Sequence, residues 1–586
     1  ELLPYLVRRL LENGSNSSFI NQLTDKQTDL DELVENPCRR IEATDCRPHR
    51  HIPLPVDLYG DERRNAIGWD LSDPDVVNEM ETELRQVCMH SWQAAARIGG
   101  HDRRGESVAL LNPADSAHAV GRVCEADRQD VERALALAAD AALPWDAAGG
   151  YKRASILLTA ADRFEEKAPE LIARVIREGG RTLRDAIAEV REAVDFCRYY
   201  ALQAKQEFER PRSLPGPTGE KNELQLHGRG VFACISPWNF PLAIFVGQIA
   251  AALAAGNSVL AKPARQTPLT GYHTICLLHE AGVPADVLHF LPGSGAAIGA
   301  QILPDRRLSG VAFTGSTDTA WKIQRALADR QGAIVPLIAE TGGQNVMIAD
   351  SSALPEQLVV DVLQSAFNSA GQRCSALRVL FVQNEIAARV IRLLAAAMQE
   401  IQIGDPLLLA SDVGPLIDQD AARSLQPHVA RLQREARLLQ RVDPPQNLQA
   451  GCFFPLQAFE LESLALLEKE VFGPVLHVVR YRADKLERVI DAVNNTGYGL
   501  TLGVHSRIEE TWLRVQARAR VGNLYINRNM IGAVVGAQPF GGEGLSGTGP
   551  KAGGPYYLHR FATERTLSVN TAAVGGNTGL LSLPED

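Results

Sequence analysis

The sequence predicts an α/β fold in which parallel strands are covered by helices on both faces. Short apolar segments alternate with longer amphipathic ones over residues 230–382, which is the pattern of parallel sheets whose strands are linked by helices. The 586 residues are 45% hydrophobic and 22% charged. That balance is ordinary for a globular protein, and the length is enough for several domains.

The first 105 residues are predicted to contribute little to this fold. Over residues 1–20 leucine recurs with helical spacing until Asn13-Gly14 ends the pattern, which predicts the end of a helix. Residues 21–105 are polar and contain scattered prolines. We predict a linker with little core of its own, interrupted by one short helix near Val76–Arg97.

Residues 106–208 are predicted to form one strand followed by three long helices. The strand is Val108–Asn112, and apolar periodicity places the helices at Asp127–Leu143, Tyr151–Glu178 and Leu183–Phe208. The apolar strands of the alternation then follow at Gly230–Ser236, Val259–Lys262, Val287–Leu291, Gly310–Thr314, Val346–Ile348 and Val379–Val382.

Charge and cysteine usage exclude several classes of protein. With a net charge of −10 and no basic cluster, the chain is not expected to bind nucleic acid. The nine cysteines are odd in number and lack C-x-x-C spacing, which favours a reducing, cytoplasmic location over a disulfide framework. No histidine or cysteine spacing predicts a metal site. The longest apolar stretch, Phe240–Ala255, contains Pro241 and is shorter than the roughly 20 residues of a membrane span.

Two polar segments follow predicted strands, where α/β sheets bind their ligands. Asn239 lies in Ile235–Pro241, directly after a strand, and its amide can donate to a developing oxyanion. Glu340 precedes Gly342-Gly343, and a carboxylate on such a loop can act as a general base on water. Each segment, taken alone, is also compatible with an ordinary turn.

Cys374 is the cysteine whose surroundings suggest chemistry. It follows Gly371, Gln372 and Arg373 and not aliphatic residues, so we expect a nearby cation to lower its pKa and make it nucleophilic. The alternative is a small buried apolar residue, which is the usual role of a lone cysteine and the one predicted for Cys234.

The order Asn239, Glu340, Cys374, each in this context, resembles the aldehyde dehydrogenase superfamily. The resemblance covers about residues 106–570 and implies a Rossmann-like NAD-binding domain, an α/β catalytic domain and a β-flap for oligomerisation. Further motifs that carry the resemblance are Lys262-Pro263-Ala264, Phe313–Thr317, Glu470–Pro474 and Pro539–Gly542.

Longer phrases resemble one branch of that superfamily, the Δ1-pyrroline-5-carboxylate (L-glutamate-γ-semialdehyde) dehydrogenases. They are Glu340–Asn345, Arg373–Ala376 and Gly532–Phe540. Tyr5–Gly14 resembles the last barrel helix of the proline dehydrogenase domain in the bifunctional proline utilization A (PutA) family. There Arg8 and Arg9 would bind the proline carboxylate. The resemblance implies the C-terminal part of such a protein, with FAD confined to the missing upstream domain.

The resemblance also implies a division of the chain into domains. Residues 1–20 would be the remnant helix, 21–105 the linker, 106–338 the NAD-binding domain, 339–560 the catalytic domain, and 561–586 an oligomerisation strand with a C-terminal tail. Strands near 213–228, with candidates at Leu224–His227 and Leu567–Asn570, would form the flap of a homodimer. The Gly-rich tail resembles a segment that closes the substrate cavity.

Site residues are carried over from the resemblance one by one. Cys374 would be the nucleophile, Asn239 the oxyanion donor and Glu340 the general base. The cofactor-binding residues would be Ile235, Ser236, Pro237, Trp238, Lys262, Gly295, Thr314, Gly315, Ser316, Thr341, Gly342, Glu470 and Phe472. The substrate would be held by Ser375, Gly532, Ala533 and Phe540.

Two positions depart from the family pattern. Arg265 stands where the lysine motif usually has a glutamate, and Ala320 replaces the second glycine of the glycine motif. NAD is expected in preference to NADP, although an arginine can pair with a 2′-phosphate.

The resemblance implies a small-molecule substrate and a cytoplasmic location. For the full-length parent it also implies peripheral association with the inner membrane. An aldehyde dehydrogenase for another aldehyde remains an alternative. A scaffold or DNA-binding role is disfavoured by the intact Cys374, Glu340 and Asn239 set and by the acidic charge.

Overall fold

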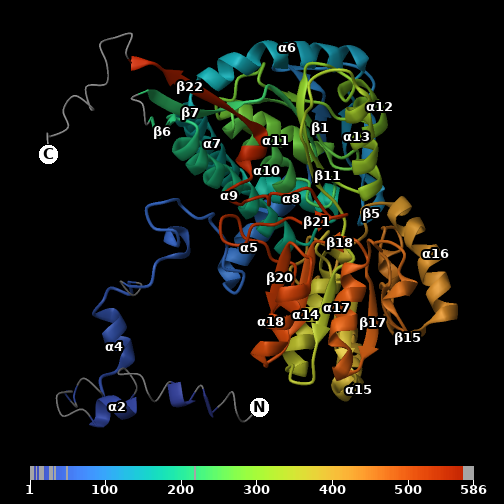
Figure 1. The fold of residues 1–586 in the computed structure, drawn as a ribbon. Helices are drawn as coiled ribbons and strands as arrows, with labels where there is room; N and C mark the ends of the chain where they lie inside the picture. The colour runs from blue at the N-terminus through green and yellow to red at the C-terminus, as the bar shows by residue number, and fades with distance from the viewer. Residues whose placement is uncertain are drawn as a thin grey trace. The chain divides into compact units, whose positions relative to one another are not determined.

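A computed structural model describes residues 6–7, 9–11, 19–24, 29, 31, 34–47, 51–216 and 220–571 (Figure 1). These divide into two compact units, Glu1–Asn65 and Ala66–Asp586. Of the predicted helix over 1–20, residues 6–7 and 9–11 are helical. Arg8 and the predicted tail beyond residue 571 lie outside the described residues.

The smaller unit holds short helices. They are α2 (Phe19–Thr24), α4 (Pro37–Glu42) and the 3₁₀ helix η1 (Pro55–Asp57). Helix α4 begins where the Asn36 side chain accepts the Cys38 N–H, a standard N-cap that satisfies one of the free donors of the first turn.

The linker prediction was wrong for residues 66–105, which belong to the large unit. Helix α5 (Pro74–Cys88) begins at an Asp73 N-cap, and its buried Met80 and Leu84 lie on the face that packs against α8 (Ala168–Gly179). The helix ends before the predicted Arg97. The chain continues as β1 (Trp92–Ala95), β2 (Arg97–Ile98) and β3 (His101–Asp102). The core partners of this segment lie far along the chain, where its own periodicity cannot show them.

The first seven-stranded sheet has the order β12-β11-β8-β9-β10-β2-β3. Its strands run parallel from β12 to β10, and β2 and β3 add antiparallel pairs at one edge. Four of its strands fall where the apolar segments predicted them. The remaining bounds are β8 (Val231–Ile235), β9 (Ser258–Lys262), β10 (Leu288–Phe290), β11 (Leu308–Thr314) and β12 (Leu337–Glu340).

Helices surround this sheet in the upper part of the view in Figure 1. The predicted helix over 151–178 is two helices, α7 (Gly150–Glu166) and α8, because Pro169 starts a new first turn after Lys167. Helix α9 (Leu183–Glu207) packs against α7 and α10. The other helices are α6 (Arg128–Ala147), α10 (Ala243–Ala254), α11 (Pro268–Glu280), α12 (Gly295–Ile302) and α13 (Thr317–Asp329).

The second seven-stranded sheet has the order β15-β16-β17-β14-β13-β19-β20, and only the β15–β16 pair is antiparallel. It occupies the lower part of Figure 1. The strands are β13 (Val346–Ala349), β14 (Val379–Gln383), β15 (Arg437–Val442), β16 (Leu456–Leu461), β17 (Val475–Tyr481), β19 (Thr501–His505) and β20 (Asn523–Ile526). The helices of this part are α14 (Pro355–Phe367), α15 (Asn384–Gln399), α16 (Gln419–Glu435), α17 (Leu486–Asn494) and α18 (Glu509–Arg518).

Three antiparallel strands form a flap, in the order β22-β7-β6. Strand β22 (Ala562–Val569) pairs with β7 (Lys221–Gly228) along its whole length, and β6 (Arg212–Leu214) adds the third strand. The strand predicted at Leu567–Asn570 is longer in the structure, where it begins at Ala562 and ends at Val569. Leu567 remains 52% exposed on this flap.

Two smaller sheets complete the described part of the chain. Strands β4 (Val108–Asn112) and β5 (Asp115–Cys124) join β1, while β18 (Tyr498–Gly499) pairs with β21 (Glu543–Gly544). Among the residues that the structure describes, no helix is both long enough and apolar enough to cross a membrane. Within the same residues, no group of three or more His, Cys, Asp and Glu could hold a metal ion.

Candidate active site

The candidate site draws on both seven-stranded sheets. Glu340 is the last residue of β12, at the carboxyl edge of the first sheet, where β8 also ends at Ile235. Cys374 lies in the segment between α14 and β14 of the second sheet. Asn239, which follows β8 of the first sheet, donates a hydrogen bond to the segment that carries Cys374, and the Glu340 charge raises the pKa of the Cys374 thiol.

Glu340 is held by the turn near the C-terminus that the family motif predicted. Its Oε2 accepts the Gly542 N–H at 3.2 Å. Its Oε1 is inaccessible to solvent and has no hydrogen-bond partner among the described residues. Burial raises the pKa of Glu340 well above its ordinary value, because a charged carboxylate loses hydration there. The carboxyl therefore has one free oxygen and a strong tendency to hold a proton, as a general base requires.

The loop before Cys374 has an unusual backbone. Ser369 and Ala370 have φ values of 56° and 54°, in the left-handed region that residues with a side chain seldom adopt. One buried arginine fixes the loop after this point. Arg378 donates to the carbonyls of Gly371 and Arg373 at 2.7 and 2.9 Å. These contacts fix the backbone of the segment that leads to Cys374.

Two amide side chains also donate hydrogen bonds to this loop. Asn239 is 7% exposed, and its Nδ2 donates to the Gln372 carbonyl at 3.1 Å. Asn345 Nδ2 donates to the Cys374 carbonyl at 2.6 Å. Asn239 thus lies against the nucleophile loop with one amide hydrogen still available, which is what an oxyanion donor needs.

The prediction that a neighbouring cation lowers the pKa of Cys374 was wrong. Burial raises the pKa of the Cys374 thiol to about 12, and the charges of Glu470 and Glu340 act in the same direction. Arg373 lowers the pKa, but its effect is smaller. The arginine side chain points instead toward Asp185, so its charge is largely compensated. Cys374 is a neutral thiol that must give up its proton during attack.

Asp185 on α9 is a site residue that the sequence did not reveal. Arg373 Nη2 donates to Asp185 Oδ1 at 2.8 Å, and the Ser369 hydroxyl donates to Oδ2 at 2.7 Å. Burial favours the neutral acid, yet Arg373 and Arg181 lower the pKa of Asp185 to about 2. One carboxylate therefore ties α9 to the loop that carries the nucleophile.

Replacing Asp185 with asparagine is expected to lower the free energy of unfolding by about 3–5 kcal/mol, because Arg373 is left buried without its partner. Since the pKa lies below the ordinary 3.8, this stabilisation is present above pH 3.8 and is lost as the pH falls toward 2. Urea unfolding measures the change. Asp484→Asn is the control, because Asp484 pairs with Arg482 and Lys485 on the surface. A loss no larger than that of the control would contradict the assignment.

The first sheet supplies the predicted cofactor residues around Lys262. Lys262 is 4% exposed at the end of β9, its ammonium donates to the Pro263 carbonyl, and burial lowers its pKa to about 8. Gly295 begins α12 beside it, since an added Cβ would lie 3.7 Å from Lys262 Cε. A cation next to a glycine at a helix N-terminus suits the ribose and phosphates of a dinucleotide.

A second group of predicted cofactor residues joins β8 and β11. Gln248 connects them, accepting the Ser236 hydroxyl at 2.8 Å and donating to Thr314 Oγ1 at 3.0 Å. Gly315 follows, where an added Cβ would lie 2.6 Å from the Phe313 ring. Ser316 is the N-cap of α13. Residues 314–316 thus lie at the end of a central strand and lead into a helix N-terminus, a position where α/β sheets bind dinucleotides.

The third group comes from the second sheet. Glu470 accepts the Gly343 N–H at 3.2 Å and lies 3.5 Å from Arg378 Nη2. A Cβ on Gly342 would overlap Glu470 Oε2, so a side chain there would displace the Glu470 carboxylate. Phe472 packs edge-to-face on Trp238, with ring centroids 5.6 Å apart. Pro237 precedes Trp238 in the turn after β8, and Thr341 donates to the Leu545 carbonyl.

The predicted substrate residues come from two segments. Ser375 is buried beside the nucleophile, and its carbonyl accepts the Thr501 hydroxyl at 3.4 Å. Gly532 and Ala533 are half-buried in a segment without regular structure. An added Cβ on Gly532 would lie 3.2 Å from Arg528 Nη2. Phe540 exchanges two backbone hydrogen bonds with Ala552, which fixes its place in the turn next to Glu340.

Comparison with known proteins decides the family. Residues 101–567 match the model of the aldehyde dehydrogenase family. The chain belongs to the aldehyde dehydrogenase family. Aldehyde dehydrogenases use NAD or NADP, which agrees with the residues found at the edges of both sheets.

Individual relatives are similar over most of the chain. "Bifunctional protein PutA" of Salmonella typhimurium is 50% identical, over 96% of this chain and 43% of the relative. "1-pyrroline-5-carboxylate dehydrogenase" of Geobacillus thermodenitrificans is 35% identical, over 89% of this chain and 99% of the relative. The chain therefore spans less than half the length of this PutA relative.

Solved structures agree with the fold of this aldehyde dehydrogenase. A variant of Bradyrhizobium japonicum Proline Utilization A has a TM-score of 0.87 and 49% identity, covering 98% of this chain and 55% of that one. A variant of Thermus thermophilus 1-pyrroline-5-carboxylate dehydrogenase has a TM-score of 0.82 and 32% identity, covering 89% and 100%. The predicted α/β aldehyde dehydrogenase fold is confirmed.

Proposed function

We propose that the chain oxidises L-glutamate-γ-semialdehyde, the open form of Δ1-pyrroline-5-carboxylate, to L-glutamate with NAD. The observation that carries the proposal is the meeting of Cys374, Glu340 and Asn239 from two sheets. The relatives whose names state this activity support the choice of substrate.

Catalysis begins at the Cys374 sulfur, which bonds to the aldehyde carbon while the thiol proton passes to solvent water. The carbonyl electron pair moves to oxygen, where the free amide hydrogen of Asn239 and the Cys374 N–H stabilise the charge. When bound, NAD supplies the hydride acceptor. Loss of hydride from the carbon leaves a thioester on Cys374. Glu340 then takes a proton from water, and the hydroxide oxygen bonds to the thioester carbon and displaces the sulfur.

The side chains that would hold the cofactor divide between the sheets. Lys262 and Glu470 would bind the two riboses, and Phe472 would pack beside the nicotinamide. Both side chains have hydrogen-bond partners that fix their positions. Lys262 donates to the Pro263 carbonyl, and Glu470 contacts Gly343 and Arg378. Fixed side chains suit a dinucleotide that must be placed within a fraction of an ångström.

The backbone at Gly532-Ala533 would hold the substrate carboxylate, with the Ser375 hydroxyl beside it. Peptide N–H groups bind a carboxylate without a flexible long side chain. Phe540 would pack against the short aliphatic part of the substrate. A glycine at 532 leaves room for this, because a larger residue would approach Arg528.

The proposed reaction is tested by following NADH formation with pyrroline-5-carboxylate and with aldehydes of equal length that lack the carboxylate. We expect kcat/KM to be at least about tenfold higher for the carboxylated substrate, the effect of roughly one charge-assisted hydrogen bond. Equal values would redirect the proposal to another aldehyde. No NADH with any of them would refute it.

NAD is expected to give a higher kcat/KM than NADP. Arg265 Nε lies 3.3 Å from Glu125 Oε1, so the arginine charge is compensated and the carboxylate would repel a 2′-phosphate. Glu125→Gln should raise kcat/KM with NADP about three- to tenfold, as expected for removing one like charge. A preference for NADP that Arg265→Glu reverses would show that the arginine binds the phosphate.

Two proposals about partners accompany this function. The flap with its exposed Leu567 is an edge through which two copies of the chain would pair as a homodimer. From the resemblance to PutA proteins we also propose, for the full-length parent, an upstream proline dehydrogenase domain with FAD, a cytoplasmic location and peripheral association with the inner membrane. Light scattering on the purified chain, with and without Leu567→Glu, tests the dimer.

A further inference from the structure

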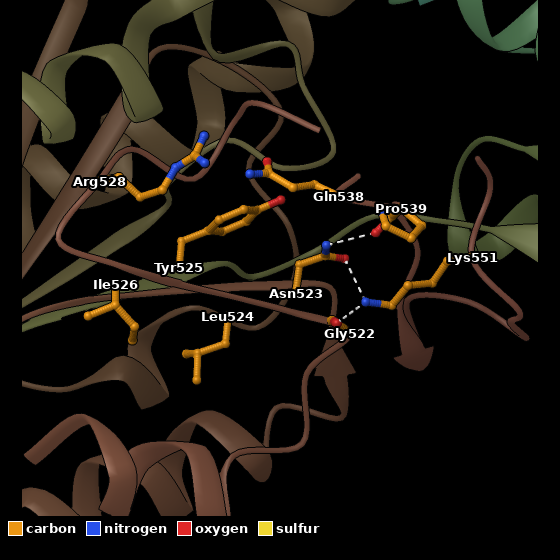
Figure 2. Close-up of a pocket in the computed structure, with 9 residues that line it drawn as sticks. All are labelled: Gly522, Asn523, Leu524, Tyr525, Ile526, Arg528, Gln538, Pro539 and Lys551. Carbon is orange, nitrogen blue, oxygen red and sulfur yellow. Dashed lines mark hydrogen bonds between the residues drawn. The ribbon is translucent and has the colours of Figure 1, made fainter. Parts of the chain in front are cut away.

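Lys551 lines a cavity of about 400 Å³ along strand β20 (Figure 2). Its ammonium donates to the Gly522 carbonyl and lies 3.4 Å from Asn523 Oδ1. Arg528 is the other cation on the wall, and it lies over the Tyr525 ring at 5.2 Å. The lysine side chain is half-buried, so its charge is only partly screened by solvent.

Gly541 lies between Lys551 and Glu340. A Cβ added to Gly541 would lie 2.7 Å from Glu340 Oε1 and 3.2 Å from Lys551 Cα. The oxygen on this side of the carboxyl is the one without a hydrogen-bond partner among the described residues. The Cα and Cγ atoms of Lys551 therefore lie on the side of the free oxygen, and its ammonium is directed to the Gly522 carbonyl.

The backbone fixes Lys551 in this place. Ala552 and Phe540 exchange hydrogen bonds of 3.0 and 2.8 Å, and the Gly554 N–H donates to the Lys551 carbonyl at 3.2 Å. The lysine is thus anchored to the same turn that supports Glu340.

Three ionisable groups act on the Glu340 carboxyl or feel its charge. They are the Cys374 thiol, the Tyr557 phenol and the Lys551 ammonium. Among the residues described, only Lys551 is a cation, and its effect on the Glu340 pKa opposes that of burial. Burial lowers the pKa of Lys551, and Glu340 counteracts that shift. The two groups therefore favour one another's charged forms.

We propose that Lys551 is a positioning residue that keeps Glu340 in its carboxylate form for hydrolysis of the thioester. The inference rests on the proposed function of Glu340 as general base. In that step a water O–H proton moves to Glu340, a C–O bond forms, and the C–S bond breaks with its electron pair on Cys374. The proton must then leave Glu340 for solvent, and a neighbouring ammonium favours that release.

The test compares Lys551→Met and Lys551→Gln with the unmodified chain by quench-flow, measuring NADH formed and glutamate released per site. The first NADH should form at a nearly unchanged rate. Glutamate release should slow about tenfold at neutral pH, and its rise with pH should move about one unit higher, the effect of removing one nearby cation. Lys551→Arg, which keeps the charge, should restore most of the rate. Lys485→Met, on a surface pair with Asp484, is the control.

Each outcome has a definite meaning. An unshifted pH dependence of glutamate release in both neutral variants would overturn the role of Lys551. The role would also be overturned if both neutral variants still bound the cofactor but failed to form the first NADH. The lysine would then act at another step of the reaction. Gln can still donate to the Gly522 carbonyl, so it separates charge from packing if Met disrupts the turn. If the unmodified chain makes no NADH, the proposed function has failed instead.

Discussion

Replacing Cys374 with alanine is expected to reduce kcat by a factor of about 10³ or more, because no other group can form the covalent intermediate. Cofactor binding should change little, since the loop is held by its backbone carbonyls and by Asn345 and Arg378 and not by the thiol. NADH formation measures the first effect and the fluorescence of bound NADH the second.

Cys234 is the matched control for this experiment. It lies fully buried in β8, with burial raising the pKa of its thiol. Cys234→Ala should therefore lower the free energy of unfolding and leave the kcat of the folded protein intact. Activity above a few per cent in Cys374→Ala would remove the cysteine from its role as nucleophile.

Glu340→Gln is expected to lower kcat by about 10²–10⁴, the usual contribution of a positioned general base. Glutamine can still accept the Gly542 N–H, so the turn should keep its place, but it cannot take a proton from water. The thioester would accumulate after the first hydride transfer. Mass spectrometry of protein quenched during turnover should show the acyl adduct on Cys374.

The pH dependence gives an independent check on Glu340. Because its pKa is raised well above the ordinary value and the carboxylate is the active form, kcat should rise with pH through that raised pKa. The acid limb of the kcat profile should therefore lie at a higher pH than the pKa of an ordinary carboxyl, and it should be absent in Glu340→Gln. An acid limb near the ordinary value would mean that Glu340 is solvated during turnover.

Much of the first sheet was predictable because its strands are short apolar segments bounded by polar turns. Glu340 was found because it lies between two apolar segments and precedes a pair of glycines, and Lys262 because its motif resembles that of the family. Cys374 was distinguished from Cys234 by its polar neighbours. These are local signals, and one chain is enough to detect them.

Other parts depend on contacts between distant segments. Asp185 occurs in a helix whose periodicity gives no sign that its carboxylate meets Arg373, 188 positions further on. Lys551 follows a predicted turn, but its proximity to Glu340 depends on how Gly541 packs. Residues 66–105 look like a linker because their buried Met80 and Leu84 have core partners far along the chain. Sequence periodicity cannot report such pairs.

The division of the site between two sheets has a consequence for heat resistance. A dinucleotide that touches Lys262 on one sheet and Glu470 on the other joins the two halves in the folded state only. Mass action then favours folding by about 2.7 kcal/mol when the free ligand is at 100 times its dissociation constant. The half-life of the protein at elevated temperature should therefore rise with the concentration of the cofactor. Protein stored or crystallised without the cofactor would be the less stable form.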